Sequence, residues 1–187
     1  MTVTPIGHLG ITLFLCAPLA NVLVTSGHRV EVPRWVGLAL VVTLVPDFDL
    51  YVPWLIHRGV THSLLAAVCL GVVVAAVVVA RWKDPLASSE DYVRRATLGF
   101  AVGAGSTISH LVGDVITPMG VRPFFPVDSV FSFNLVYAKD TGANLAFIVI
   151  GVVVFWTVYR RSKDPVPIGP ATSTDLATES ETSPVSP

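Results

Sequence analysis

Long apolar stretches alternate with short polar segments along the chain, and this pattern predicts membrane-spanning helices. Residues 62–80 (HSLLAAVCLGVVVAAVVVA) and 143–159 (ANLAFIVIGVVVFWTVY) contain no acidic or basic side chain apart from His62. A helix needs about 20 mainly apolar residues to cross a bilayer. On this criterion the chain has five predicted spans, at about 6–24, 36–55, 62–81, 97–118 and 143–159.

The residues outside these spans define the expected domain organisation. From Arg160 onward the chain is rich in Pro, Ser, Thr and Glu and has too little apolar surface to fold. We therefore expect an all-α integral membrane protein, with a bundle of about five transmembrane helices over residues 1–160 and a disordered polar tail over residues 161–187. The stretch GFAVGAG at 99–105 supplies a small-residue surface, which favours close helix packing more than a dimer contact.

Composition supports a membrane protein and excludes several other classes. The 187 residues are 52% hydrophobic and only 13% charged, whereas soluble domains carry about 25% charged residues. A net charge of −1 gives no indication of a nucleic-acid partner. Cys16 and Cys69 lie in apolar windows and are interpreted as packed hydrophobes rather than a disulfide. The first span lacks a basic segment before it, so we expect a retained helix rather than a signal peptide.

The distribution of basic residues predicts the orientation of the bundle. In a five-span topology one side holds nine bases: Arg29, Arg34, Arg81, Lys83, Arg94, Arg95, Arg160, Arg161 and Lys163. The other side holds three: Arg58, Arg122 and Lys139. Because basic residues concentrate in cytoplasmic loops, we expect a multi-pass protein of the cell membrane with its N-terminus outside and its C-terminus in the cytoplasm.

On this topology seven ionisable side chains gather toward the extracytoplasmic face. They come from four predicted spans and the loop between two of them: His8, Asp47, Asp49, His57, His62, His110 and Asp114. Of the histidines, only His28 lies on the other side. Ionisable side chains inside a membrane bundle are costly and commonly mark a functional site.

His110 and Asp114 are the strongest local signal. Four residues apart on a helix, they share one face and can reach a single cation. A hydrogen bond that only holds two helices together explains the pair equally well. Near the end of the second predicted span, Pro46 precedes Asp47 and Asp49. Two close carboxylates repel unless a cation lies between them, although a pair facing solvent is the alternative.

Two loops add candidate polar groups. The connection His57-Arg58-Gly59-Val60-Thr61-His62-Ser63 is short, and a turn at Gly59 could bring its two histidines together, although both could be incidental to a surface loop. The planar guanidinium of Arg58 suits phosphate or carboxylate. After the fourth span, the segment TPMGVRPFFP at 117–126 is predicted to cover the site or to anchor at the interface, with Arg122 able to meet an anionic group.

Together these side chains offer both imidazole nitrogens and carboxylate oxygens. This donor set suits zinc, manganese or iron, whereas magnesium and calcium prefer all-oxygen shells. A metal ion would also compensate the charge of the aspartates. If the site keeps a coordination position open, the pKa of a bound water falls toward about 7, and hydroxide becomes available for hydrolysis.

The motifs in their order resemble a known family. His8, PDFDLY at 46–51, HRGVTHS at 57–63 and SHLVGDVITPMGVRPFFP at 109–126 are similar to the YdjM-like family of membrane-bound metal-dependent hydrolases, over about residues 5–160. This resemblance implies a hydrolase more firmly than a substrate. A fainter resemblance to the all-helical zinc phospholipase C and nuclease fold implies ligand roles for His8, Asp49, His62, His110 and Asp114. Because the last span lacks a second donor pair, we expect one or two ions rather than three.

The leading hypothesis is a membrane-embedded hydrolase that uses a divalent metal ion, with zinc favoured over manganese or iron, on a phosphoester that is lipid-like. The expected metal ligands come from the set His8, Asp47, Asp49, His62, His110 and Asp114. His57 is the candidate general acid or base, and Arg58 and Arg122 are expected to hold an anionic group.

Two other function classes remain open from the sequence. A metal-ion or proton transporter could use the same cluster, but the polar residues that would continue its path are few: Thr12, Asn21, Thr43 and Ser106. A non-catalytic membrane scaffold would use the histidines and aspartates only to join helices. The expected partners are the lipid bilayer and a small-molecule or lipid substrate, with no nucleic acid and no prediction of oligomeric state.

Overall fold

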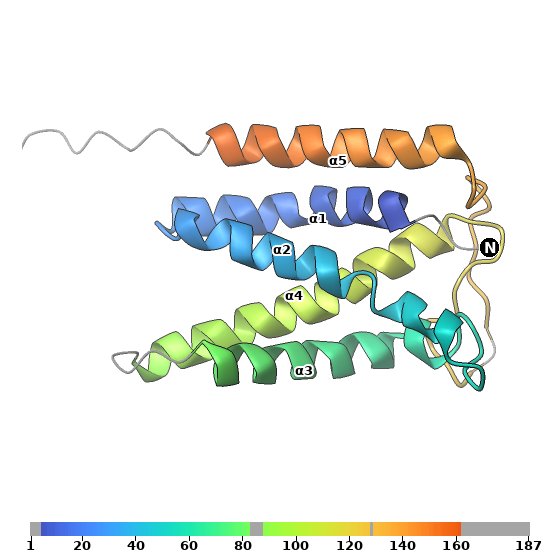
Figure 1. Cartoon of the computed structure of the whole chain (residues 1–187), viewed down its shortest axis with the longest axis horizontal. Coiled ribbons are helices and arrows are strands. Elements are labelled where there is room, and N and C mark those ends of the chain that lie inside the picture. The colour runs from blue at the N-terminus through green and yellow to red at the C-terminus, as the bar shows by residue number, and fades with distance from the viewer. Residues whose placement is uncertain (1–4, 83–87, 128, 162–187) are drawn as a thin grey trace, which may run out of the picture.

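In the computed structural model, which describes residues 5–82, 88–127 and 129–161, five α-helices lie side by side along one axis (Figure 1). Their bounds are α1 Pro5–Thr25, α2 Val32–Val42, α3 Leu64–Arg81, α4 Ser89–Val115 and α5 Thr141–Arg161. Three short 3₁₀ segments connect them: η1 Arg29–Glu31, η2 Pro46–Tyr51 and η3 Val60–His62. The all-helical prediction is confirmed for this part of the chain, whereas the predicted tail lies almost entirely outside the described residues.

Three of the five helices have the length and apolar composition needed to cross a membrane, namely α1, α3 and α5. The predicted count of five spans is therefore not confirmed. The second predicted span divides into the 11-residue helix α2 and the 3₁₀ segment η2, because the α-helix ends before Pro46. Helix α4 has 27 residues but carries Ser, Thr, His and Asp side chains on its buried face.

Small residues set the close approach of the helices. A Cβ atom added to Gly99 or Gly103 of α4 would lie 2.8 Å from the Cα atom of Ala75 or Gly71 on α3. Between α1 and α5, a Cβ on Gly151 would overlap the backbone of Gly10. The prediction that the glycines of 99–105 serve helix packing holds for Gly99 and Gly103, whereas Gly105 faces open space.

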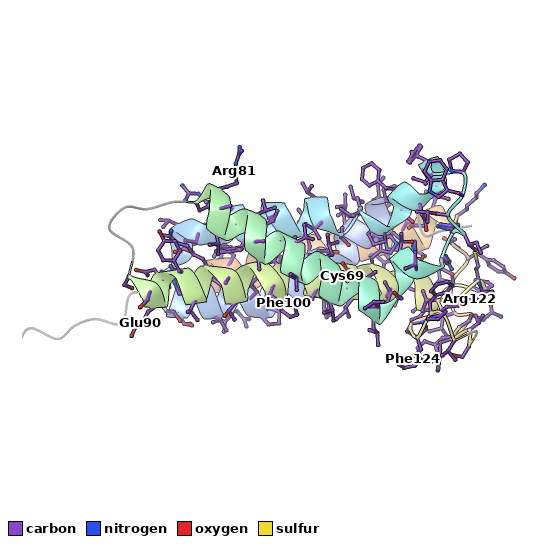
Figure 2. All side chains as sticks on the ribbon, turned by 90° about the horizontal axis from the view of Figure 1, so that it is seen from below. Cys69, Arg81, Glu90, Phe100, Arg122 and Phe124 are labelled. Carbon is purple, nitrogen blue, oxygen red and sulfur yellow. The ribbon has the colours of Figure 1, made fainter. Side chains whose placement is uncertain are left out.

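An apolar core fills the end of the bundle that is distant from η2 and η3, which we call the tryptophan end. Trp35 is completely buried and packs edge-on against Trp82, with ring centroids 4.9 Å apart. At the rim, Glu31 accepts hydrogen bonds from Trp35 Nε1 and from Arg94, both at 3.0 Å. Figure 2 shows Arg81 and Glu90 at this end, and Arg122 and Phe124 at the opposite end.

Local caps explain where two helices begin. Helix α4 starts with a capping box in which Ser88 and Asp91 exchange hydrogen bonds. Helix α3 starts after Ser63, whose hydroxyl accepts the amide hydrogen of Ala66 at 3.1 Å. The second cap places His62 directly before α3, at the end of the bundle that holds the candidate site.

Candidate metal centre

The structure brings all seven predicted ionisable side chains together at one end of the bundle, which we call the site end. Here α1 begins, α4 ends, and η2, η3 and the loop segments 116–127 and 129–140 close over the helices (Figure 1). His8 comes from α1, His110 and Asp114 from α4, and the other four from η2, η3 and the turn between them: Asp47, Asp49, His57 and His62. Their convergence therefore depends on contacts between segments up to about 100 residues apart.

Four side-chain atoms form a compact group that we call the tetrad: Asp47 Oδ1, His62 Nε2, His110 Nε2 and Asp114 Oδ2. The two Nε2 atoms are 3.2 Å apart. Each lies 3.5 Å from Asp47 Oδ1, and Asp114 Oδ2 lies 3.3 Å from His62 and 3.5 Å from His110. Ligands about 2.0–2.1 Å from a tetrahedral metal ion are about 3.3–3.4 Å from one another. These five distances are therefore in the range expected between neighbouring ligands of one metal ion.

Hydrogen bonds behind the imidazole rings set which nitrogen faces the tetrad. His110 Nδ1 donates to the backbone carbonyl of Thr43 at 2.7 Å. His62 Nδ1 lies 2.9 Å from Thr61 Oγ1 and 3.3 Å from Asp49 Oδ2, so its proton also has acceptors on that side. In both rings the proton on Nδ1 leaves the lone pair of Nε2 directed into the tetrad. Histidines that bind metal ions are generally oriented in this way.

The two aspartates of η2 have different positions. Asp47 directs Oδ1 into the tetrad. Asp49 lies behind His62, where it accepts hydrogen bonds from Thr61 Oγ1 at 2.6 Å and from His57 Nδ1 at 2.8 Å. A 3₁₀ helix has three residues per turn, so side chains two positions apart point to different sides. The structure thereby separates two carboxylates that were both candidate ligands in the sequence, where the resemblance to the phospholipase C fold implied a ligand role for Asp49.

Arg58 is buried, and its guanidinium is directed at Asp114. Its Nη2 donates to Asp114 Oδ1 at 2.5 Å, and its Nη1 donates to the Gly120 carbonyl at 2.7 Å and to Thr117 Oγ1 at 3.0 Å. Burial lowers the pKa of the Arg58 guanidinium, and the charge of Asp114 opposes this shift. Arg58 therefore fixes Asp114 and the covering loop, which differs from the predicted contact with an anionic substrate group.

His8 lies against the tetrad on the side of α1. Its ring stacks on that of His110, with centroids 3.9 Å apart and planes at 11°. Its Nε2 is 3.6 Å from Asp114 Oδ1. A Cβ atom on Gly113 would lie 2.6 Å from His8 Nδ1, so the glycine makes room for this ring. His8 is thus close enough to be a further ligand or to support a second ion.

The polar atoms left without partners fit a bound cation. Among the described residues, the buried atoms at this end that lack a hydrogen-bond partner include His8 Nδ1 and Nε2, Asp47 Oδ1, His57 Nε2 and Asp114 Oδ2. Leaving buried polar or charged atoms unpaired is costly. The three carboxylates of the site also outnumber Arg58, whose guanidinium bonds to Asp114. A divalent cation in the tetrad would satisfy the carboxylate oxygens and offset their charge.

His57 and Arg122 line a polar cavity beside the tetrad. The cavity has a volume of about 240 Å³ and is also lined by Arg58, Gly120 and Val130. His57 is the outer histidine of the site, with 22% of its side chain exposed and its Nδ1 bonded to Asp49. The predicted acid or base and one predicted basic residue therefore lie on one side of the tetrad.

Several contributing residues were not candidates from the sequence. The Thr43 carbonyl orients His110, the Thr61 hydroxyl links Asp49 to His62, and Thr117 accepts from Arg58. Thr61 and Thr117 lie within two motifs identified in the sequence, so their location near the site was predictable, whereas their hydrogen bonds were not. The part played by Thr43 depends on irregular backbone after α2, for which the sequence gives no signal.

Comparison with known proteins places the chain in a family. A family model described as YdjM inner membrane protein matches residues 1–172. No curated protein and no solved structure matches the chain, so the resemblance to the helical phospholipase C fold remains an expectation. The match and the apolar helices together show a membrane protein. The chain belongs to the YdjM inner membrane protein family.

Proposed function

We propose that this protein is a membrane-embedded hydrolase that binds a divalent metal ion in the tetrad and cleaves phosphoesters. The proposal rests on the five distances of 3.2–3.5 Å that join two imidazole nitrogens to each other and to two carboxylate oxygens at the site end. From the distribution of basic residues we place the site end at the extracytoplasmic face of a multi-pass protein.

The geometry narrows the proposed ligands. Asp47, His62, His110 and Asp114 would bind the ion directly, and Asp49 would orient His62 and His57 from behind. One ion fits the tetrad, and His8 is the group nearest to a second position. Two nitrogen and two oxygen donors suit zinc, manganese or iron. We propose zinc first, because its preferred four-coordinate geometry has the observed spacing.

Catalysis requires a coordination position that the four ligands do not fill. Asp47 is the one member of the tetrad with an exposed side chain, at 15%, whereas the other three are fully buried. Water and substrate would therefore reach a bound ion from the side of Asp47. Zinc sites can expand to five-coordinate during reaction.

A bound divalent ion would supply a water activated for attack near neutral pH and would polarise the phosphoryl oxygen. Attack by the water oxygen on phosphorus breaks the bond to the ester oxygen, and the leaving alkoxide needs a proton. His57 can donate that proton from Nε2 while Asp49 holds its Nδ1 at 2.8 Å. Arg122, at the same cavity, is placed to hold a phosphate oxygen.

The transporter alternative has one supporting observation. Below the tetrad, Thr12 donates to Thr43 Oγ1 at 2.9 Å, Ser109 contacts Thr12, and Thr43 bonds to the Ser106 carbonyl at 3.2 Å. These buried hydroxyl groups extend the polar interior. Beyond them the described core is apolar, with Ala20, Ala39 and Val102 buried, and Asn21 is exposed. This path therefore stops within the bundle, which favours the hydrolase.

The proposal is tested with metal-loaded protein in detergent and a panel of soluble and lipid phosphomonoesters and phosphodiesters. We expect hydrolysis that is lost in the ligand variant His110→Ala and falls at least about a hundredfold in His57→Gln, as for removal of a general acid. His28→Gln is the matched control, because His28 is an exposed histidine of the tryptophan end. Bound metal with flux into liposomes and no hydrolysis would establish the transporter instead, and bound metal with neither would indicate a scaffold.

A further inference from the structure

An apolar groove on the outside of the bundle is lined at one end by residues that directly precede Asp47 and His62 in the chain. It has a volume of about 360 Å³ and runs along α3, lined by Thr61, Leu65, Cys69, Val73 and, from the other wall, Pro46 and Thr107. Almost all of its lining surface is hydrocarbon. Cys69 was predicted to be packed inside the protein, but it is exposed in this groove (Figure 2). The groove has no role in the function proposed above.

The groove lies on a helix that has the composition of a membrane span. On α3 the neighbouring side chains Leu65, Val68 and Val72 are more than half exposed and form an outer surface suited to lipid. Leu65 and Val73 are about 12 Å apart along the axis, at 1.5 Å per residue. One leaflet of the hydrocarbon core is about 15 Å thick. A groove of this length would extend across most of the thickness of one leaflet.

The end of the groove near η2 and η3 borders the residues that position the tetrad. Pro46 directly precedes Asp47, and the Thr61 hydroxyl donates to Asp49 Oδ2 at 2.6 Å. The polar cavity that contains His57 and Arg122 adjoins the same group of residues. The groove and the cavity therefore flank the tetrad, one apolar and the other with basic side chains.

We infer that the groove holds the acyl chain of the substrate, so that the substrate is a membrane amphiphile with an anionic phosphate head. This inference rests on the proposed function. The chain lies along α3 in the groove, the phosphate meets the tetrad, and the head group extends toward Arg122. An amphiphile would place its acyl chain against the apolar groove and its charged head in the polar cavity. A water-soluble phosphoester would contact only the polar cavity.

The test uses two α3 variants that differ only in where they place a phenyl ring. Cys69→Phe fills the groove, and Val68→Phe adds the same ring to the exposed neighbour that does not line it. The probe is hexadecyl phosphate with a photoreactive diazirine in its chain, added to the metal-loaded protein in phosphatidylcholine nanodiscs. Labelled peptides are located by mass spectrometry. The corresponding alcohol, hexadecanol with the same diazirine, reports on lipid contact without the charged head.

We expect labelling of the wild type to concentrate between Leu65 and Val73, to fall at least about tenfold in Cys69→Phe, and to persist in Val68→Phe. The alcohol should label this segment less than the phosphate does. If α3 and α5 are labelled to the same extent, or if the alcohol labels α3 as strongly as the phosphate does, the groove holds only bulk lipid and the inference is overturned. Labelling that is lost equally in both variants would do the same.

A hydrolysis assay separates this inference from the proposed function. If the protein is a hydrolase, Cys69→Phe should lower kcat/KM for hexadecyl phosphate at least about tenfold and leave the hydrolysis of p-nitrophenyl phosphate unchanged. Specific labelling without hydrolysis of either compound would support the groove and contradict the hydrolase. Hydrolysis of both compounds with equal efficiency in wild type and Cys69→Phe would support the hydrolase and contradict the groove.

Discussion

The two ends of the bundle contain the largest fully buried side chains of the described residues, and these are chemically opposite. At the tryptophan end Trp35 packs on Trp82 within an aliphatic core. At the site end the corresponding side chains are three histidines, His8, His62 and His110. Helices α1 and α4 contribute to both ends. The same helices therefore enclose a well-packed apolar core at one end and, at the other, a polar cluster in which some buried nitrogen and oxygen atoms have no hydrogen-bond partner.

Packing at the tryptophan end thus stabilises the fold, whereas the site end holds the residues proposed for function. Packing at the tryptophan end needs no added component, because its polar groups are bonded to one another at the rim, as Glu31 is to Trp35 and Arg94. The unpaired carboxylate oxygens of Asp47 and Asp114 instead need a cation. We therefore expect substitutions at the two ends to have separable effects on the free energy of unfolding and on metal affinity.

The largest expected effect on the metal-free protein is at the tryptophan end. Trp35→Ala removes a fully buried ring and leaves a cavity, which should lower the free energy of unfolding by about 3–5 kcal/mol. The metal affinity of the variant that remains folded should stay within about twofold of wild type. Unfolding by detergent titration and metal competition with a chelating dye measure the two quantities. A large loss of metal affinity in this variant would show that the two ends are coupled.

The converse test is metal-dependent stabilisation at the site end. A ligand that binds only the folded state at about a thousand times its Kd adds about 4 kcal/mol to stability. The wild type and Trp35→Ala should both gain this amount on addition of zinc, whereas His110→Ala should gain almost none. The measurement is the shift in the unfolding transition with and without a chelator. Equal stabilisation of His110→Ala would contradict the assignment of the tetrad.

A smaller effect is expected from the carboxylate behind His62. Asp49→Asn removes the negative charge that His57 and His62 face but keeps a similar shape. Loss of an outer hydrogen-bond partner typically lowers metal affinity about 10–100-fold. Asp47→Asn, which alters a proposed ligand, should lower affinity further. If the two variants have the same affinity, the distinction drawn between Asp47 and Asp49 is wrong.

Sequence reasoning identified this cluster because its strongest members lie in regular structure. His110 and Asp114 are one helical turn apart, and their shared face is predictable from spacing alone. The different positions of Asp47 and Asp49 depend on the 3₁₀ geometry of η2, which forms only after α2 ends at Val42. The unexpected role of Arg58 depends on contacts with Asp114 and Gly120, more than 50 residues away. Such long-range contacts leave no local pattern.

The count of spans was harder to predict for a related reason. Residues 36–55 are apolar enough to suggest a helix through the membrane, but Pro46 and the two aspartates interrupt it. Helix α4 appears polar by composition because its inward face carries the site and its supporting hydroxyl groups. The residues that build the site are thus the ones that obscure the membrane pattern.

The smallest expected effect is the pH dependence at the rim of the tryptophan end. Burial raises the pKa of Glu31, but hydrogen bonds from Arg94 and Trp35 and the Arg94 charge outweigh it and hold the pKa below its usual range. Because the folded-state pKa is depressed, the contribution of Glu31 is present above its unfolded pKa and is lost as the pH falls through the folded value. For a partly exposed ion pair this amounts to less than about 1 kcal/mol. Glu31→Gln should flatten the acid side of the stability profile by that amount without changing metal affinity.

Elemental analysis of the purified protein beside Asp114→Ala tests whether the tetrad binds a metal ion. We predict about one divalent ion per chain in the wild type after metal loading and removal of excess, and less than about a tenth of this content in the variant, since metal affinity depends on each ligand. A helical circular-dichroism spectrum like that of the wild type would show that Asp114→Ala is folded. Full metal content in the folded variant, or none in the loaded wild type, would contradict the account.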